Sequence, residues 1–228
     1  MGSVGNKVTV HNQLGVSGKD LWELNYDSFG NAARSINPNY GSGAEYSSNC
    51  ALCSTAAMLS MRGYDVEAQK RDKEWRGPVD VFDFDYRNYD NYISPADSKM
   101  NVTGMKWADS QFNPNKFTKD TEKNVEIIEN ALNKWGNNSY GELIVGWSRG
   151  NRFHSVIAVN HAGKIKIIDF QTGETYTVKE YLSRTRTTPS GRKKQRIKAG
   201  YLELKRMDNA PIKQNIPDLN KMVKKKVR

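Results

Sequence analysis

The two cysteines of the chain lie three positions apart, in a stretch that is typical of a short helix. The run from Asn49 to Gly63 is rich in Ala, Leu and Met, and Gly63 stands where a helix would end. Asn49 is a suitable N-cap, so Cys50 and Cys53 are both expected in the first turn. Free backbone N–H groups and the positive end of the helix dipole favour a thiolate at such a position. The first chemistry that the sequence indicates is therefore that of a cysteine nucleophile.

A base for this nucleophile has to come from one of three histidines. His154 lies in a run of β-branched residues that predicts a strand, and a second strand-like run ends at Asp169. The short turn from His161 to Gly163 joins the two runs, so antiparallel pairing is expected to bring His154 beside Asp169. A cysteine, a histidine and a carboxylate that orients the imidazole form the triad of a thiol enzyme.

The order and spacing of these motifs resemble the papain-fold toxin family, whose members are predicted glutamine deamidases of bacterial polymorphic toxins. The resemblance covers about residues 36–206 and is carried by Asn49-Cys50-x-x-Cys53, Arg62 to Ala68, His154 and Asp169-x-Gln171-x-Gly173. In addition, Asn37-Pro38-Asn39-Tyr40 resembles a related domain that follows some phage head-morphogenesis proteins. The resemblance implies an α+β, papain-like fold in which an N-terminal cysteine helix packs on an antiparallel sheet. It also implies glutamine deamidation.

Roles for the site residues follow from this comparison. The run Cys50-Ala51-Leu52-Cys53-Ser54 resembles the Cys-Trp-Ala-Phe-Ser of papain-like proteases, which makes Cys50 the nucleophile and Cys53 its apolar neighbour. Cys53 stays as the alternative nucleophile, and a third interpretation treats both cysteines as small core residues. His154 is expected to take the thiol proton and later to activate water, while Asp169 fixes the imidazole.

Two further residues are candidates for contact with the substrate. The backbone N–H of Cys50 is the expected oxyanion donor, and the side chain of Asn49 is one candidate to assist it. Gln171 either binds substrate or shapes the turn that follows Asp169.

The residues leave several alternatives open. Deamidase, cysteine protease and transglutaminase share the thioester and differ in the leaving group or in the group that resolves it. A zinc site of Cys50, Cys53, His154 and His161 would need unusual spacing, so no metal and no cofactor is expected. The alternative of another class is a non-enzymatic phage virion or nucleic-acid-associated protein that uses a papain-like fold for packing or binding.

Positive charge is concentrated in the last fifth of the chain. The net charge is +10, whereas Ser183 to Arg228 alone carries 15 Lys and Arg against three Asp and Glu, a net +12. Such a block indicates a solvated segment, a contact with DNA or another polyanion, or docking on the acidic run Asp80 to Asp85. The candidate polyanion-binding residues are Arg192, Lys193, Lys194, Arg196, Lys224, Lys225 and Lys226.

The elements that must position the site suggest three parts. Residues 1–35 form a leader, which contains His11, and a helix; residues 36–206 form the papain-like domain with an insertion at about 69–118; residues 207–228 form a basic tail without a core of its own. The expected helices are Asn49–Met61, Lys119–Trp135 and a short one at Thr177–Leu182. The expected strands are Val79–Tyr86, Glu142–Trp147, Phe153–Val159, Lys164–Phe170 and Ala199–Lys205, and a basic hairpin loop is expected at Arg184–Lys198.

The composition also bears on location and partners. No apolar run reaches the roughly 18 residues that a membrane span requires, and Met1 to Gly18 is too polar for a signal peptide. Two cysteines three apart on one helix make a poor disulfide, so a reduced pair is expected. These features suggest the bacterial cytoplasm or a phage virion, with delivery into a target cell as a further route. The expected partners are a protein substrate and phage head or toxin-delivery proteins.

Overall fold

The computed structural model describes residues 29–72, 81–96, 113–148, 153–187, 194–213, 216 and 218–226. The chain forms two compact units, each built from separate stretches of sequence. The first, here called the cysteine unit, comprises Met1–Phe84, Ile168–Thr175 and Met207–Arg228. The second, here called the sheet unit, comprises Asp85–Ile167 and Tyr176–Arg206.

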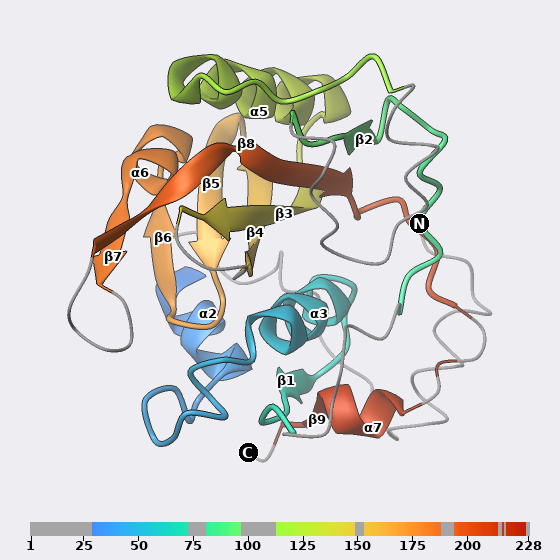
Figure 1. Cartoon of the computed structure of the whole chain (residues 1–228). Helices are drawn as coiled ribbons and strands as arrows, with labels where there is room; N and C mark the ends of the chain where they lie inside the picture. The colour runs from blue at the N-terminus through green and yellow to red at the C-terminus, as the bar shows by residue number, and fades with distance from the viewer. Residues whose placement is uncertain are drawn as a thin grey trace. The chain divides into compact units, whose positions relative to one another are not determined.

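The cysteine unit is centred on helix α3 (Cys50–Ser60), which is buried on all sides from Leu52 to Ser60. The helix has no charged residue, and its only polar residues are small ones, Ser54, Thr55 and Ser60, so it has no face that favours solvent and is stable inside the protein. It ends in a turn at Gly63, whose φ of 92° lies in the left-handed region that glycine adopts without strain. The remaining elements of the unit are α2 (Phe29–Ile36), β1 (Val66–Ala68), α7 (Leu219–Met222) and β9 (Val223–Lys225), seen in Figure 1.

The segment after residue 206 is an integral part of the cysteine unit and not a tail without a core. Strand β9 pairs antiparallel with β1, and Val223 lies opposite Ala68. Seven of its apolar residues are buried: Met207, Ala210, Ile212, Ile216, Leu219, Met222 and Val223. These residues are spread among lysines and prolines, so no local periodicity indicates them in the sequence, and contacts with distant parts of the chain, such as the pairing with β1 and the bridge from Ile212 to Phe82, bring them into the core.

The sheet unit contains most of a seven-stranded sheet with the strand order β2-β8-β3-β4-β5-β6, in which β7 pairs with β8 outside this path. The expected antiparallel pairing is present between β2 and β8, β3 and β4, β3 and β8, and β7 and β8. The strands are β2 (Tyr92–Ile93), β3 (Tyr140–Trp147), β4 (Phe153–His161), β5 (Lys164–Asp169), β6 (Glu174–Tyr176), β7 (Thr185–Thr187) and β8 (Lys194–Arg206).

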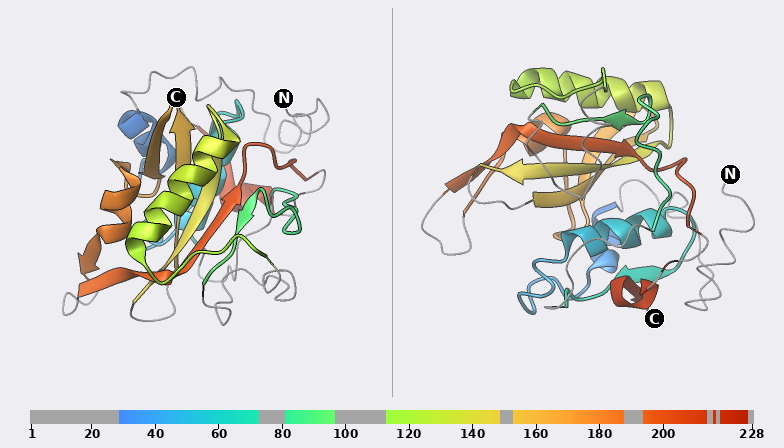
Figure 2. Two further views of the ribbon diagram at one scale, coloured as in Figure 1. Left: turned by 90° about the horizontal axis from the view of Figure 1, so that it is seen from above. Right: turned by 45° about the vertical axis from the view of Figure 1, so that its right-hand side comes forward.

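Helix α5 (Thr121–Trp135) covers one face of this sheet, as Figure 1 shows from the side and Figure 2 from above. Asp120 caps its first turn by accepting the N–H groups of Glu122 and Lys123. Its apolar stripe forms one core with the residues of the strands that face it, as its sequence predicts. The stripe consists of Val125, Ile128, Leu132 and Trp135, and the facing residues include Leu143, Val145, Val156, Leu202 and Leu204.

Other expectations differ from the structure or lie outside it. The strand expected at Val79–Tyr86 is reduced, within its described residues, to a single bridge between Phe82 and Ile212. The basic hairpin expected at Arg184–Lys198 has regular strands, β7 and the start of β8. A short helix, α6 (Val178–Ser183), follows a capping box at Thr177 as expected. The leader, with His11, and the helix expected before Phe29 lie outside the described residues.

Candidate active site

Both cysteines lie in the first turn of α3, but in different surroundings. Cys50 is the first residue of the helix and is partly exposed, whereas Cys53 is buried, and neither forms a disulfide. Burial raises the pKa of the Cys53 thiol well above its ordinary value, and the nearby Cys50 and Asp169 raise it further. Cys53 is therefore held as a neutral thiol at physiological pH, and Cys50 is the more accessible sulfur.

The cap of the cysteine helix differs from the one that the sequence predicts. Asn49 occupies the N-cap position, but its side chain makes no capping hydrogen bond. Its amide group instead donates to the main-chain oxygen of Gln69 at 3.0 Å. The backbone N–H groups of Asn49 and Cys50 donate to the side-chain oxygen of Gln171, each at 2.9 Å, in the orientation of the Gln171 carboxamide that satisfies these donors. Gln171 thus caps the helix from a distant part of the sequence.

Asp169 is the last residue of β5, and its fully buried carboxylate organises the turn that follows. Its Oδ1 accepts the N–H of Gln171 at 3.1 Å and that of Thr172 at 3.4 Å. The N–H of Gly173 donates to the main-chain oxygen of Asp169 at 2.8 Å, and the φ of Gly173 is 80°. The motif from Asp169 to Gly173 is therefore a tight turn whose carboxylate also acts on the electrostatics of Cys53.

Asn37 belongs to the same site, although sequence reasoning assigned it no role there. Its amide group donates to the main-chain oxygens of Gln171 and Tyr46, both at 3.0 Å, and it is buried with Asn49. Twelve positions separate Asn37 from Asn49, a spacing that no helix or strand periodicity relates. Its only sequence signal is its place in the motif that precedes the cysteine helix.

His154 is the second residue of β4 and belongs to the sheet unit, where it is buried. It lies directly opposite Val145 of β3, so these two side chains share one face of the sheet. The strand order places β4 next to β5, in agreement with the expected hairpin. His161, at the other end of β4, is partly exposed, and its Nδ1 lies 2.9 Å from the side-chain oxygen of Asn138.

The structure thus gathers five of the predicted site residues in the cysteine unit: Asn49, Cys50, Cys53, Asp169 and Gln171. The sixth, His154, belongs to the sheet unit. Within the described part of the chain, no three His, Cys, Asp or Glu side chains lie close enough together to hold a metal ion. The same residues contain no helix that is long and apolar enough to cross a membrane.

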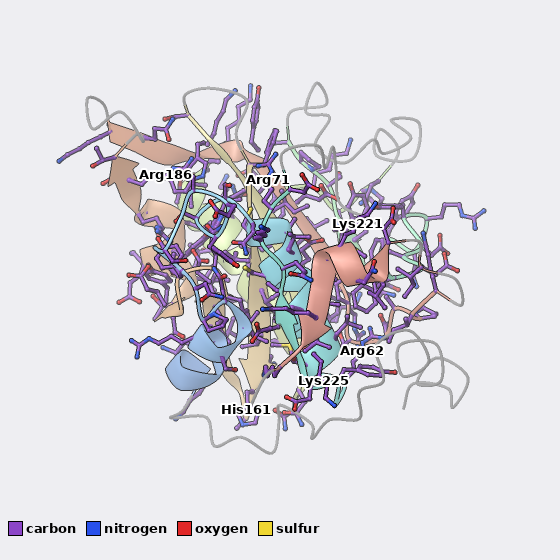
Figure 3. The ribbon with its side chains drawn as sticks, turned by 90° about the horizontal axis from the view of Figure 1, so that it is seen from below. Arg62, Arg71, His161, Arg186, Lys221 and Lys225 are labelled. Atoms are coloured by element: carbon purple, nitrogen blue, oxygen red, sulfur yellow. The ribbon has the colours of Figure 1, made fainter. Side chains whose placement is uncertain are left out.

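Of the basic residues singled out in the sequence, those that the structure describes are divided between the two units. Lys224 is paired with Glu67 at 2.8 Å, and Lys226 lies 4.0 Å from Asp65 and donates to Ser35, so both serve the cysteine unit internally. Lys225, between them on β9, is exposed; Figure 3 shows it near the end of the strand, with Lys221 on α7. Lys194 and Arg196 are exposed at the start of β8 in the sheet unit, and Arg192 and Lys193 lie outside the described residues.

The chain has a cysteine at the start of a buried helix and a mostly antiparallel sheet. One strand of the sheet carries a histidine, and another ends in a buried aspartate. These features define a papain-like α+β protein. The chain belongs to the family described as papain fold toxin 1, glutamine deamidase, which it matches over residues 48–174, more than half of its 228 residues. Comparisons with curated proteins and with solved structures give no match.

Proposed function

We propose that the protein hydrolyses the side-chain carboxamide of a glutamine in a protein substrate. In this mechanism the thiolate of Cys50 adds to the carboxamide carbon, and the C–N bond breaks as ammonia leaves with a proton from His154. Water, deprotonated by the same imidazole, then cleaves the thioester, and this step yields glutamate and restores the thiol. Asp169 holds the imidazole in the orientation that these proton transfers need.

The observation that carries this proposal is the contrast between the two thiols of one helix turn. Cys50 is accessible at the positive end of α3, where a thiolate is favoured, whereas burial and the neighbouring groups keep Cys53 protonated. Family membership supplies the reaction type, because the family is described as a glutamine deamidase. A deamidase of this kind acts on glutamine in a protein, and this makes a protein the proposed partner.

The role proposed for His154 is supported by the strand order and by the turn that joins β4 to β5. His154 stands near the start of β4, and β4 neighbours β5, whose last residue is Asp169. The hairpin turn between the two strands has Ala162 and Gly163 at φ of 51° and 74°, the left-handed pair of a two-residue type I′ turn. Such a turn fixes the strand register without slippage, so the start of β4 and the end of β5 belong to the same end of the hairpin.

The test is to express the protein in bacterial cells and to search the cellular proteins by mass spectrometry for glutamine converted to glutamate. Wild type is expected to produce at least one such conversion with release of ammonia, and Cys50→Ala and His154→Ala are expected to produce none. Cys53→Ala and His161→Ala are the matched controls and are expected to retain the conversion. A new peptide-bond cleavage that depends on Cys50 would assign a protease instead, and conversion by Cys50→Ala would exclude the proposed nucleophile.

A further inference from the structure

The start of the cysteine helix is capped by the side chain of Gln171, which lies far from the helix in the sequence. Helices usually satisfy their first N–H groups with the side chain of the N-cap residue. Here the side chain of Asn49 is engaged elsewhere, and the carboxamide oxygen of Gln171 accepts the N–H groups of both Asn49 and Cys50. One of these two donors belongs to the residue that we propose as the nucleophile.

The backbone of Gln171 is itself held in place by two hydrogen bonds. Its main-chain oxygen accepts a hydrogen bond from Asn37, and its main-chain N–H donates to the carboxylate of Asp169. The Asn49 side chain links to Asn37 Oδ1 at 3.3 Å, so three buried amide side chains surround the helix start. A buried network of amides that are hydrogen-bonded to one another has few alternative arrangements.

Gln171 therefore connects the turn of Asp169 with the start of the cysteine helix. Its backbone is fixed by the turn of Asp169, and its side chain is fixed by the first turn of α3. We infer that Gln171 is a positioning residue, whose side-chain oxygen caps the cysteine helix and ties Cys50 to the Asp169 turn. The inference concerns the same site as the proposed deamidase and rests on that proposal only for the importance of Cys50.

One consequence concerns the oxyanion donor expected from the sequence. The N–H of Cys50 already donates to Gln171, so in the free protein this donor has an acceptor. A reacting carboxamide that used the same N–H would have to share it with Gln171. In the structure, the group that accepts the N–H of Cys50 is a carboxamide oxygen, the same kind of group as in the proposed substrate.

The first test measures amide hydrogen exchange in the peptide that contains Asn49 and Cys50. Gln171→Ala removes the acceptor, and exchange of these two amides is expected to accelerate about fivefold or more, the change that corresponds to the loss of one capping interaction. Gln171→Glu keeps an oxygen at the same reach and is expected to retain slow exchange. Gln195→Ala removes another buried glutamine, in the sheet unit, and is the matched control.

The second test follows alkylation of Cys50 by iodoacetamide as a function of pH, with peptide mapping to identify the labelled thiol. Gln171→Glu places a negative charge beside Cys50, so the midpoint of its pH profile is expected to move to higher pH, with the full rate regained above that midpoint. A side chain that does not lie beside Cys50 would leave the midpoint of Gln171→Glu at the wild-type value, and this result would overturn the inference.

Unchanged exchange in Gln171→Ala would also overturn the inference, since the helix start would then not depend on this cap. Neither readout requires turnover of a substrate. If both follow the expected course while Cys50→Ala still converts glutamine in cells, the cap is correct and the proposed function is wrong. If both fail while the conversion depends on Cys50, the proposed function stands without the cap.

Discussion

Lys205 Nζ lies 2.6 Å from Glu142 Oε2, across the pair formed by β8 and β3, and both side chains are nearly inaccessible to solvent. Ser155 of β4 donates to the other oxygen of Glu142 at 2.7 Å. A second acid, Glu203, lies two residues before Lys205 on β8 and is fully buried. Among the described residues neither of its carboxylate oxygens has a hydrogen-bond partner. The buried ammonium of Lys205 is therefore close to two buried carboxyl groups, and of these only Glu142 is bonded to it.

Glu203→Gln is expected to change how stability depends on pH. Burial raises the pKa of Glu203 from 4.5 to about 7, against the lowering effect of Lys205, and Glu142 adds to the rise. The folded state therefore holds this proton more tightly than the unfolded state, and the stability it contributes is present below pH 4.5 and is lost as pH rises to about 7. Glutamine has no proton to lose, so wild type should lose on the order of 3 kcal/mol relative to Glu203→Gln between these limits. Urea unfolding at pH 5 and pH 8 measures this difference, and an equal pH dependence in both proteins would contradict it.

Glu142→Gln is expected to destabilise the protein at neutral pH. Burial raises the pKa of Glu142, but the charge and hydrogen bond of Lys205 lower it by more, so the net pKa is below its ordinary value. The carboxyl is therefore ionised at neutral pH and neutralises a buried ammonium. Its loss leaves Lys205 with the less well placed Glu203, and a cost of about 3 kcal/mol is expected for a broken buried pair. Chemical denaturation at pH 7 measures the cost. A stability equal to that of wild type would show that Glu203 replaces Glu142 fully.

The two thiols are expected to react with iodoacetamide at very different rates. Because burial and the neighbouring groups raise the pKa of Cys53, only Cys50 should be labelled quickly at neutral pH. Cys53 should become reactive when the protein is unfolded in urea. Peptide mapping after short exposure locates the label, and Cys50→Ala should remove it. Rapid labelling of Cys53 in folded Cys50→Ala would make Cys53 the nucleophile.

Lys224 and Lys225 are adjacent on β9 and provide a matched pair for the role of the basic segment. Lys224→Met leaves the mostly buried Glu67 without its cation, and a loss of about 1–2 kcal/mol is expected. Lys225 is exposed, so Lys225→Met should change stability by less than about 0.5 kcal/mol. Thermal or urea unfolding of both variants distinguishes a structural lysine from a surface one. Equal losses would show that the ion pair with Glu67 contributes nothing specific.

The sequence predicts those parts of the fold that depend on local signals. The cap at Asp120 and the apolar stripe ending at Trp135 define α5, and alternation with β-branched residues defines β4 and β5. The family resemblance, now established by the match over residues 48–174, rests on motifs of a few residues each. Such signals act within one helix turn or one hairpin, which is the range over which sequence patterns are informative.

What the sequence does not predict depends on contacts between distant residues. Asn49 is of a residue type that commonly caps helices, yet Gln171 takes that role. The folded chain brings the longer Gln171 side chain to the backbone N–H groups of Asn49 and Cys50. Lys224 and Lys226 belong to a run that the sequence predicts to be solvated, and their pairing with Glu67 and Asp65 gives them a structural role. The alternation from Val79 to Tyr86 predicts a strand, but a strand also needs a partner along its length, and the described part has one bridge.

The cysteine unit joins three stretches of chain that are far apart in sequence, and its small sheet combines β1 with β9. On the ribosome, the helix with the two thiols emerges early, whereas the strand that closes the sheet beside β1 is made near the end. The surroundings of the two cysteines are therefore completed only after translation has passed Lys225. A nascent or prematurely terminated polypeptide carries the cysteines without the finished fold around them, so the proposed activity would be tied to synthesis of the chain through β9.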